Sequence, residues 1–448
     1  MVNDIQKKRT GIFSWYFETS LLIRIFSALV LGAVVGLVVG PEIAWVNPLG
    51  VIFVRLLKMI VMPVVIFTLV VGSASVHPSR LGRIGVKALG FYMLTSAFAV
   101  AIGLLFANLF SPGESLELVG TAGAIGKTLQ APSLIDTFIN IIPTNPFNAV
   151  SSGKILPTIL ISIIFGIGVS HLKENNDERI QNAANTVFSF FEGGAEVMYK
   201  VVGWVLEYAP IGVFALIAVV FGKQGAQAFG PLAIVTIAVY CAFLCHAFLV
   251  YGGLLSIYRI NFFKFLFNAR TAIVTSFVTR SSGGTLPVTM EIAKKKMGVS
   301  RGVYSFTLPL GATINMDGAA IYQGVCAIFV GLAIGLPLSI EQQVTVIITA
   351  VLASIGSAGV PGAGAIMLLM VLESVGLKVE AGSAVAAAYA MILGIDALLD
   401  MGRTALNVTG DLAVTCAIAK TEKEFDENIM NGDNEFTDAP RVTAVASE

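Results

Sequence analysis

Six polar residues near the end of the chain repeat at the spacing of one helix face. They are Asp396, Asp400, Arg403, Thr404, Asn407 and Asp411. The surrounding sequence is apolar, and in a bilayer such charges are costly unless they face a cavity or a partner. The planar fork of Arg403 suits a carboxylate, and Asp400, one turn away, can accept an ammonium group. The stripe therefore indicates a pocket for an amino acid with an acidic side chain.

Oxygen-bearing residues of the same region could bind hard cations, which prefer oxygen ligands. The side-chain ligands would be Asn315, Asp317, Asn407 and Asp411. Unwound backbone at Gly311, at Thr313 and in a later glycine-rich segment would add carbonyl oxygens.

The formal charges of this region do not cancel. The aspartates at positions 317, 396, 400 and 411 contribute −4, and Arg280 and Arg403 contribute +2, which leaves −2. Buried charge of that size requires counter-ions. An amino acid of net charge −1 would bring the site to −3, so about three monovalent cations would neutralise it. The count predicts uptake that is coupled to cations.

The composition excludes a water-soluble protein. The 448 residues are 56% hydrophobic and only 12% charged, whereas soluble domains carry about 25% charged residues. With 28 Lys and Arg against 28 Asp and Glu, the chain also lacks the basic field that attracts nucleic acid.

Eight apolar stretches are long enough to cross a bilayer. They lie near 21–39, 51–73, 88–110, 156–171, 195–221, 229–257, 303–333 and 383–418. Lys and Arg gather before the first stretch and after the second, fourth and sixth, which predicts that both termini are cytoplasmic. The first stretch lacks a small-residue cleavage site, so it is interpreted as a retained span.

Two further apolar stretches, 271–293 and 347–374, contain helix breakers in their middle. Positive residues flank the first on both sides, which predicts a re-entrant hairpin entering from the cytoplasm. The second has almost no flanking charge and predicts a hairpin entering from outside. Each precedes an apolar stretch interrupted by polar residues, an inverted repeat typical of secondary transporters. Glycines that only allow close helix packing would explain neither the opposite entry nor the ionisable residues.

Four ordered motifs carry a family resemblance: 280–287 (RSSGGTLP), 315–318 (NMDG), 359–364 (GVPGAG) and 400–411 (DMGRTALNVTGD). Together they resemble the glutamate/aspartate transporter family, the dicarboxylate/amino acid:cation symporters, and especially its archaeal and bacterial sodium-driven members. The resemblance covers the chain to about residue 420. It implies an all-α polytopic membrane protein with eight transmembrane helices, two re-entrant helical hairpins, and a homotrimer in the lipid bilayer.

The resemblance also implies a division of the chain into moving and static parts. The static scaffold would comprise 21–73 and 131–221. An elevator-type transport domain would comprise 86–110 and 229–418, with the second hairpin as its extracellular gate. Residues 1–20 would be a cytoplasmic N-terminus, and 420–448 a solvated, acidic cytoplasmic tail.

Residue roles follow from the same resemblance. The implied substrate-binding set is Arg280, Ser281, Ser282, Met316, Ala319, Val360, Pro361, Gly362, Ala363, Gly364, Asp400, Arg403, Thr404 and Asn407. Three sodium sites would use Tyr92, Thr95, Ser96, Gly311, Thr313, Asn315, Asp317, Ser354, Ile355, Ser357, Asn407 and Asp411. Ala319 stands where acidic-substrate members commonly have Thr, which leaves the preference between aspartate and glutamate open. Met401 stands where potassium-coupled animal members carry Arg, so no potassium counter-transport is expected.

Sodium-coupled uptake of L-aspartate or L-glutamate across the plasma membrane is the function that these observations favour. The alternative within the same fold is a proton-coupled or neutral amino acid or C4-dicarboxylate carrier, although a plain dicarboxylate has no ammonium for Asp400. An ion channel is a second alternative, which uncoupled flux would reveal. An intramembrane enzyme with Ser281 or Ser282 as nucleophile lacks a convincing base, because the three histidines are remote in sequence.

Overall fold

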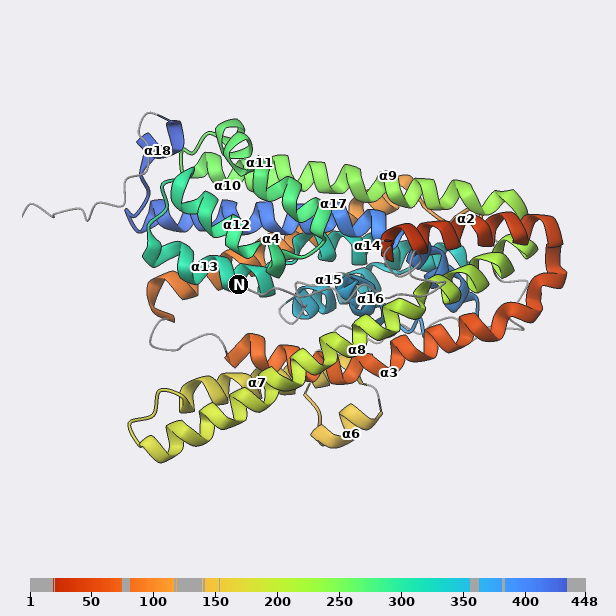
Figure 1. Ribbon diagram of the computed structural model, residues 1–448, viewed down its shortest axis with the longest axis horizontal. Helices are drawn as coiled ribbons and strands as arrows, with labels where there is room; N and C mark the ends of the chain where they lie inside the picture. The colour runs from red at the N-terminus through yellow and green to blue at the C-terminus, as the bar shows by residue number, and fades with distance from the viewer. Residues whose placement is uncertain are drawn as a thin grey trace, which may run out of the picture.

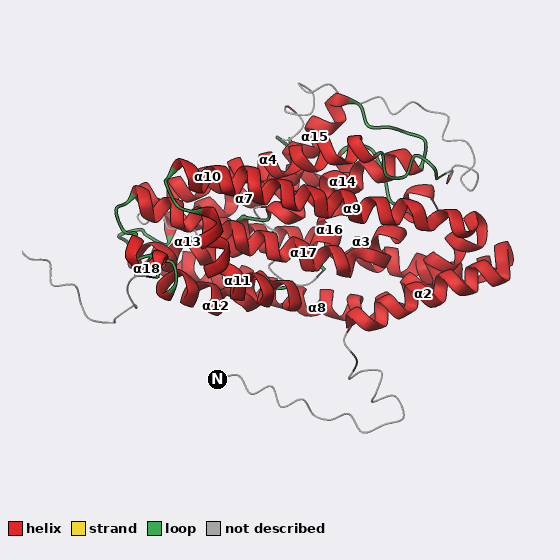
Figure 2. Cartoon of the chain, turned by 90° about the horizontal axis from the view of Figure 1, so that it is seen from above, coloured by secondary structure: helices red, strands yellow, loops and turns green. Residues whose placement is uncertain are grey.

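The chain folds into a bundle of helices. The computed structural model describes residues 21–74, 81–116, 142–152, 154–354, 362–380 and 383–432, together with residues 19, 118 and 139. Every regular element in these ranges is helical (Figures 1 and 2). Six helical stretches of the described chain are long and apolar enough to cross a membrane: Ile23–Ala74, Arg83–Phe110, Glu178–Gln224, Phe229–Ile257, Arg301–Ala333 and Ala384–Thr421.

The first of these stretches contains the first two predicted crossings. They are α2 (Leu21–Val39) and α3 (Asn47–Ala74), joined by the 3-10 helix η1 (Gly40–Val46). The fourth predicted crossing corresponds to the shorter helix α7 (Ile155–Leu172), and the fifth lies within α8 (Glu178–Gln224). The number of crossings, eight, therefore stays a prediction.

The helices pack in two groups. In the first group, α2 and α3 lie along α8, and α7 packs against α3. In the second group, α14 (Asp317–Ala333) and α17 (Ala384–Thr421) run through the middle of the bundle, with α9 (Phe229–His246) and α4 (Val86–Phe110) packed against them (Figure 1).

The two central helices are buried on nearly every side. A helix that is buried on every side belongs to the core of a large protein. Helix α2, by contrast, exposes large apolar side chains such as Phe26 and Val38. The polar stripe of α17 consequently faces protein and not lipid.

Glycines allow α2 and α8 to approach closely. A Cβ on Gly32 would lie 2.7 Å from the carbonyl oxygen of Phe214, and one on Gly36 would lie 2.4 Å from that of Ala218. Small residues at intervals of four are a common means of bringing membrane helices into backbone contact. The pairing of α2 with α8 therefore depends on the missing side chains.

Gly36→Ala is expected to destabilise the fold by about 1–3 kcal/mol, because the added methyl group forces the two backbones apart. Thermal unfolding of the purified protein in detergent would measure the effect. Gly203→Ala is the matched control: Gly203 is an exposed position of α8 with open space around it, so alanine there should be neutral or slightly stabilising. Equal losses for the two variants would contradict this account of the packing.

A pair of helices occupies each predicted hairpin and begins earlier than predicted, whereas re-entry into the membrane stays a prediction. The first consists of α11 (Phe262–Thr279) and α12 (Ser282–Lys295), and the second of α15 (Ile340–Ser354) and α16 (Ala363–Ser374). The predicted starts, 271 and 347, are too late because charged and polar residues in the first turns masked the apolar pattern.

Side-chain caps fix the true starts of the hairpins. Asn261 accepts a hydrogen bond from the backbone N–H of Lys264 at 3.0 Å and so starts α11. Ser339 and Gln342 bond each other's backbone N–H groups at the start of α15, as in a capping box. At the first hairpin's tip, Arg280 ends α11 in the left-handed conformation and Ser281 caps α12.

The start of the predicted acidic tail packs on the bundle and is not a solvated extension. Glu422 forms ion pairs with Arg83 (2.6 Å) and Lys87 (2.7 Å) near the start of α4. These two partners hold the pKa of Glu422 below its usual range. Further along, Phe425 forms a β-bridge with Val299. Residues 433–448 of the predicted tail lie outside the described chain.

Candidate functional site

A buried arginine with two carboxylates forms the first half of the candidate site. Arg403 of α17 is 2% exposed, and its Nη2 lies 2.7 Å from Oδ1 of Asp400 one turn away. Its Nη1 lies 3.2 Å from Oδ1 of Asp396. The guanidinium also lies over the ring of Tyr322 in α14, 4.3 Å from its centroid. Two carboxylates against one guanidinium give this cluster a formal charge of −1.

The beginning of α16 covers this cluster. The backbone N–H of Gly362 donates to Oδ2 of Asp400 at 3.2 Å, and Gly362 has φ +80°, a conformation that favours glycine. A Cβ on Gly364 would lie 2.4 Å from Nη1 of Arg403. The second hairpin therefore reaches both groups that could hold an amino acid, the carboxylate and the guanidinium.

The break between α13 (Arg301–Ile314) and α14 lies against Asn407 and Arg403 of α17. Helix α13 ends just before the NMDG motif, and α14 begins within it, at Asp317. Oδ1 of Asn407 accepts from the backbone N–H of Gly318 at 2.7 Å, and its Nδ2 donates to the sulfur of Met316 at 3.1 Å. A Cβ on Gly318 would lie 2.3 Å from the carbonyl oxygen of Arg403. The broken helix and α17 thus meet backbone to backbone.

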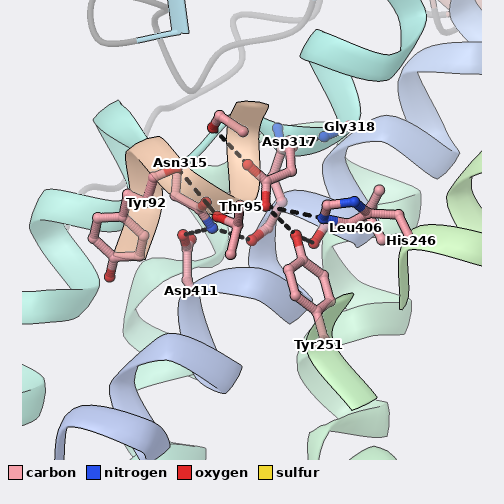
Figure 3. A network of polar contacts seen from close by, with 11 residues as sticks. Tyr92, Thr95, His246, Tyr251, Asn315, Asp317, Gly318, Leu406 and Asp411 are labelled. Atoms are coloured by element: carbon pink, nitrogen blue, oxygen red, sulfur yellow. Dashed lines mark hydrogen bonds and ion pairs between the residues drawn. The ribbon is translucent and has the colours of Figure 1, made fainter. Parts of the chain in front are cut away.

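A second polar cluster centres on Asp317, the first residue of α14 (Figure 3). Ser96 of α4 donates to Oδ1 of Asp317 at 2.6 Å, and the hydroxyl of Tyr251 donates to Oδ2 at 2.7 Å. Nε2 of His246 lies 3.2 Å from the same Oδ2. Asp317 and His246 are completely buried.

Asp411 is the second carboxylate of this cluster. Nδ2 of Asn315 donates to its Oδ1 at 3.0 Å, while Oδ1 of the same asparagine lies 3.4 Å from the hydroxyl of Thr95. A Cβ on Gly311 would lie 2.5 Å from Oδ1 of Asp411 and 2.8 Å from the hydroxyl of Tyr92. Glycine at 311 therefore lets these oxygens crowd against α13.

The electrostatics of the second cluster are unbalanced. Asp317 and Asp411 are 0% and 2% exposed, and no Lys or Arg side chain of the described ranges forms an ion pair with either. Two buried carboxylates with no Lys or Arg partner require a cation or proton. The ligands around them are hydroxyl, amide and carboxylate oxygens, which suit a hard cation such as sodium. The structure thus separates a pocket with a guanidinium from a pocket with two carboxylates and, among the described residues, no Lys or Arg partner.

The structure brings most of the predicted residues into these two clusters. Thr404 bonds the backbone oxygen of Asp400, and Ala319 is buried at the start of α14. Ser281 and Ser282 lie at the tip of the first hairpin with Arg280. Four predicted residues lie outside the described chain: Ile355, Ser357, Val360 and Pro361. Ala363 begins α16, and Ser354 ends α15.

One prediction about the backbone is wrong. Gly311 and Thr313 are helical residues of α13, and unwinding begins only at Asn315. The carbonyl of Gly311 accepts the N–H of Asn315 at 2.8 Å. The helix continues because the three residues after Gly311 are not helix breakers, and the break comes at the polar residues of the NMDG motif. Helix α17 is likewise continuous through its polar stripe.

The sequence analysis does not assign four residues of these clusters to the site. Asp396 belongs to the predicted stripe but has no predicted ligand role, and the predicted site does not include Tyr322, His246 or Tyr251. Spacing could have found Asp396, which is seven residues before Arg403 on the same helix face. The other three come from different helices, so no local spacing signals them.

Comparisons of the sequence with known proteins give matches over most of the chain. Residues 21–421 match the model of the sodium:dicarboxylate symporter family. The chain is 37% identical to the proton/sodium-glutamate symport protein of Bacillus caldotenax, over 90% of this chain and 95% of that protein. It is 35% identical to the proton/glutamate-aspartate symporter of Escherichia coli (strain K12), over 85% and 86%. It is 30% identical to the C4-dicarboxylate transport protein of Bacillus subtilis (strain 168), over 91% and 95%.

Proposed function

This chain belongs to the sodium:dicarboxylate symporter family, and we propose that it takes up L-aspartate or L-glutamate together with sodium ions. It is a multi-pass membrane transporter and not an enzyme. The observation that carries the sodium part is the pair of buried carboxylates, Asp317 and Asp411, neither of which has a Lys or Arg partner in the described chain. Sodium would neutralise these carboxylates, and the charge balance of the whole region asks for about three ions.

The substrate part rests on the Arg403 cluster. In the structure, Asp400 satisfies Arg403, so the two groups hold each other. An amino acid with an acidic side chain can replace that bond without leaving either charge unpaired: its ammonium goes to Asp400 and its carboxylate to Arg403. A C4-dicarboxylate would satisfy Arg403 but leave Asp400 facing a second anion. The geometry therefore favours an amino acid over a plain dicarboxylate.

The movement that we propose is an elevator in a homotrimer. Helices α4 and α9 to α17 would slide as one body along α2, α3, α7 and α8, with the second hairpin as the extracellular gate. The contacts of Gly362 and Gly364 with Asp400 and Arg403 support that gate. At the boundary between the two groups, Lys58 of α3 lies 3.5 Å from Glu373 of α16, and both side chains are about one-third exposed. Such a pair adds little stability and would not prevent sliding.

Equilibrium binding to the purified protein tests this function. Radiolabelled L-aspartate, L-glutamate and succinate would be measured in sodium and in choline at one pH. We expect high affinity for an acidic amino acid in sodium only, and weak binding of succinate. Tight succinate binding would favour the C4-dicarboxylate carrier. Amino acid binding that is independent of sodium but strengthens at lower pH would favour the proton-coupled carrier.

The proposed location is the plasma membrane, with both termini in the cytoplasm.

A further inference from the structure

A histidine that the sequence left without a role contacts the carboxylate of the proposed cation pocket. His246, the last residue of α9, is fully buried, and its Nε2 lies 3.2 Å from Oδ2 of Asp317 (Figure 3). The hydroxyl of Tyr251 reaches the same oxygen at 2.7 Å. The rings of His246 and Tyr251 pack edge to face, with centroids 4.7 Å apart at 86°.

The local backbone brings these two rings onto one side of the helix. Residues five apart in an α-helix point about 140° away from each other. Between them lies the π-helix η5 (Ala247–Tyr251), whose i to i+5 hydrogen bonds bring residues five apart into line. No Gly or Pro in Ala247–Tyr251 accounts for the wider turn. Its effect is to direct His246 and Tyr251 at one carboxylate oxygen.

Packing alone does not explain a histidine at this position. Nδ1 of His246 has no hydrogen-bond partner in the described part of the chain, and an unsatisfied buried polar atom is destabilising. Leucine or phenylalanine would fill the same space without that cost. The contact of Nε2 with Asp317 is the gain that offsets this cost. With Asp317 ionised, the contact is attractive when Nε2 carries the proton, because two lone pairs would repel.

The donors around Asp317 leave little of its carboxylate free. An ionised carboxylate offers about four acceptor positions. Tyr251 and His246 use two of them on Oδ2, and Ser96 uses one on Oδ1. One position on Oδ1 is left.

We propose that His246 is a positioning residue for the coupling cation: together with Tyr251 it holds Oδ2 of Asp317, so that the carboxylate offers the cation only Oδ1. This inference rests on the proposed function, in which Asp317 is a sodium ligand. It adds a residue, a donor atom and a geometric role that the proposed site lacks.

Three variants of His246 test the role. His246→Leu removes the donor, His246→Gln places an amide N–H near the position of Nε2, and His246→Asn has an amide too short to reach. The measurements are the sodium concentration that half-saturates aspartate binding, and the affinity for aspartate at saturating sodium. We expect the sodium requirement to rise about tenfold or more in the Leu and Asn variants. In the Gln variant it should return to within about threefold of the parent, with aspartate affinity at saturating sodium unchanged in all three.

The outcomes distinguish a failure of the positioning role of His246 from a failure of the proposed function. An unchanged sodium requirement in His246→Leu, or a Gln variant as impaired as the Leu variant, overturns the positioning role. Tyr251→Phe provides a second test if His246→Leu fails to fold, because it removes the other donor and should also raise the sodium requirement; no change there overturns the proposal. Asp317→Asn is the separate control. If the parent shows no sodium requirement, or Asp317→Asn keeps it, the proposed function fails first.

Discussion

Arg403→Gln is expected to lower the affinity for aspartate and glutamate by roughly 30-fold to several thousand-fold. Truncating one partner of a buried, hydrogen-bonded charge pair costs about 2–5 kcal/mol, and each 1.4 kcal/mol is about tenfold. Arg403 is the only arginine or lysine in contact with the described substrate cluster, so the variant would lack the cation that holds the side-chain carboxylate of the substrate. Isothermal titration with saturating sodium would measure the loss.

Two controls separate substrate binding from folding in this experiment. Arg403→Lys keeps the charge but not the planar fork, and should lose less than Arg403→Gln. Stabilisation of Arg403→Gln by sodium alone should persist, because Asp317 and Asp411 do not contact Arg403 in the described structure. A folded Arg403→Gln protein that binds aspartate as the parent does would refute the role of this arginine.

Asp411→Asn is expected to have two opposite effects on stability. Without sodium, the fold should be as stable as the parent or more stable, since one of two buried carboxylates without a Lys or Arg partner is gone. A ligand at a thousand times its Kd stabilises the protein that binds it by about 4 kcal/mol. Because the variant lacks a sodium ligand, the stabilisation that sodium gives the parent should largely vanish. Thermal unfolding across a series of sodium concentrations, with choline keeping the ionic strength constant, would show both effects.

Glu422→Gln is the matched control for Asp411→Asn. It also removes one carboxylate, but Glu422 lies past the end of α17 against Arg83 and Lys87. Its sodium response should match that of the parent. An Asp411→Asn protein that keeps the full sodium response would show that this carboxylate is not part of a cation site.

Local patterns predicted the parts of the site that lie on one helix. Asp400 and Arg403 are three residues apart, and α17 brings them into contact as the spacing requires. The NMDG motif lies at the break after α13, but the predicted unwinding at Gly311 and Thr313 comes too early, and α17 continues through its own polar residues. Sequence and structure agree on Asp400 and Arg403 because the geometry of a single helix settles the outcome.

Contacts between helices could not be predicted in the same way. Tyr322 stacks on Arg403 from a helix about 80 residues away in sequence. His246 and Tyr251 reach Asp317 only because the backbone between them widens into a π-helix, which their residue types do not indicate. The predicted start of the first hairpin, 271, is too late because Lys264 and Arg270 interrupt the apolar pattern, whereas both are exposed residues of α11. Caps at Asn261 and Ser339 were the sequence signals that would have corrected the starts of both hairpins.

Uptake into liposomes that contain the purified protein tests the central claim most directly. Radiolabelled L-aspartate would be supplied outside, with an inward sodium gradient and the same pH on both sides. We predict accumulation above the external concentration, and its loss when choline replaces sodium or when Arg403→Gln replaces the parent. Accumulation driven by an inward proton gradient in the absence of sodium, with no response to the sodium gradient, would contradict sodium-coupled uptake.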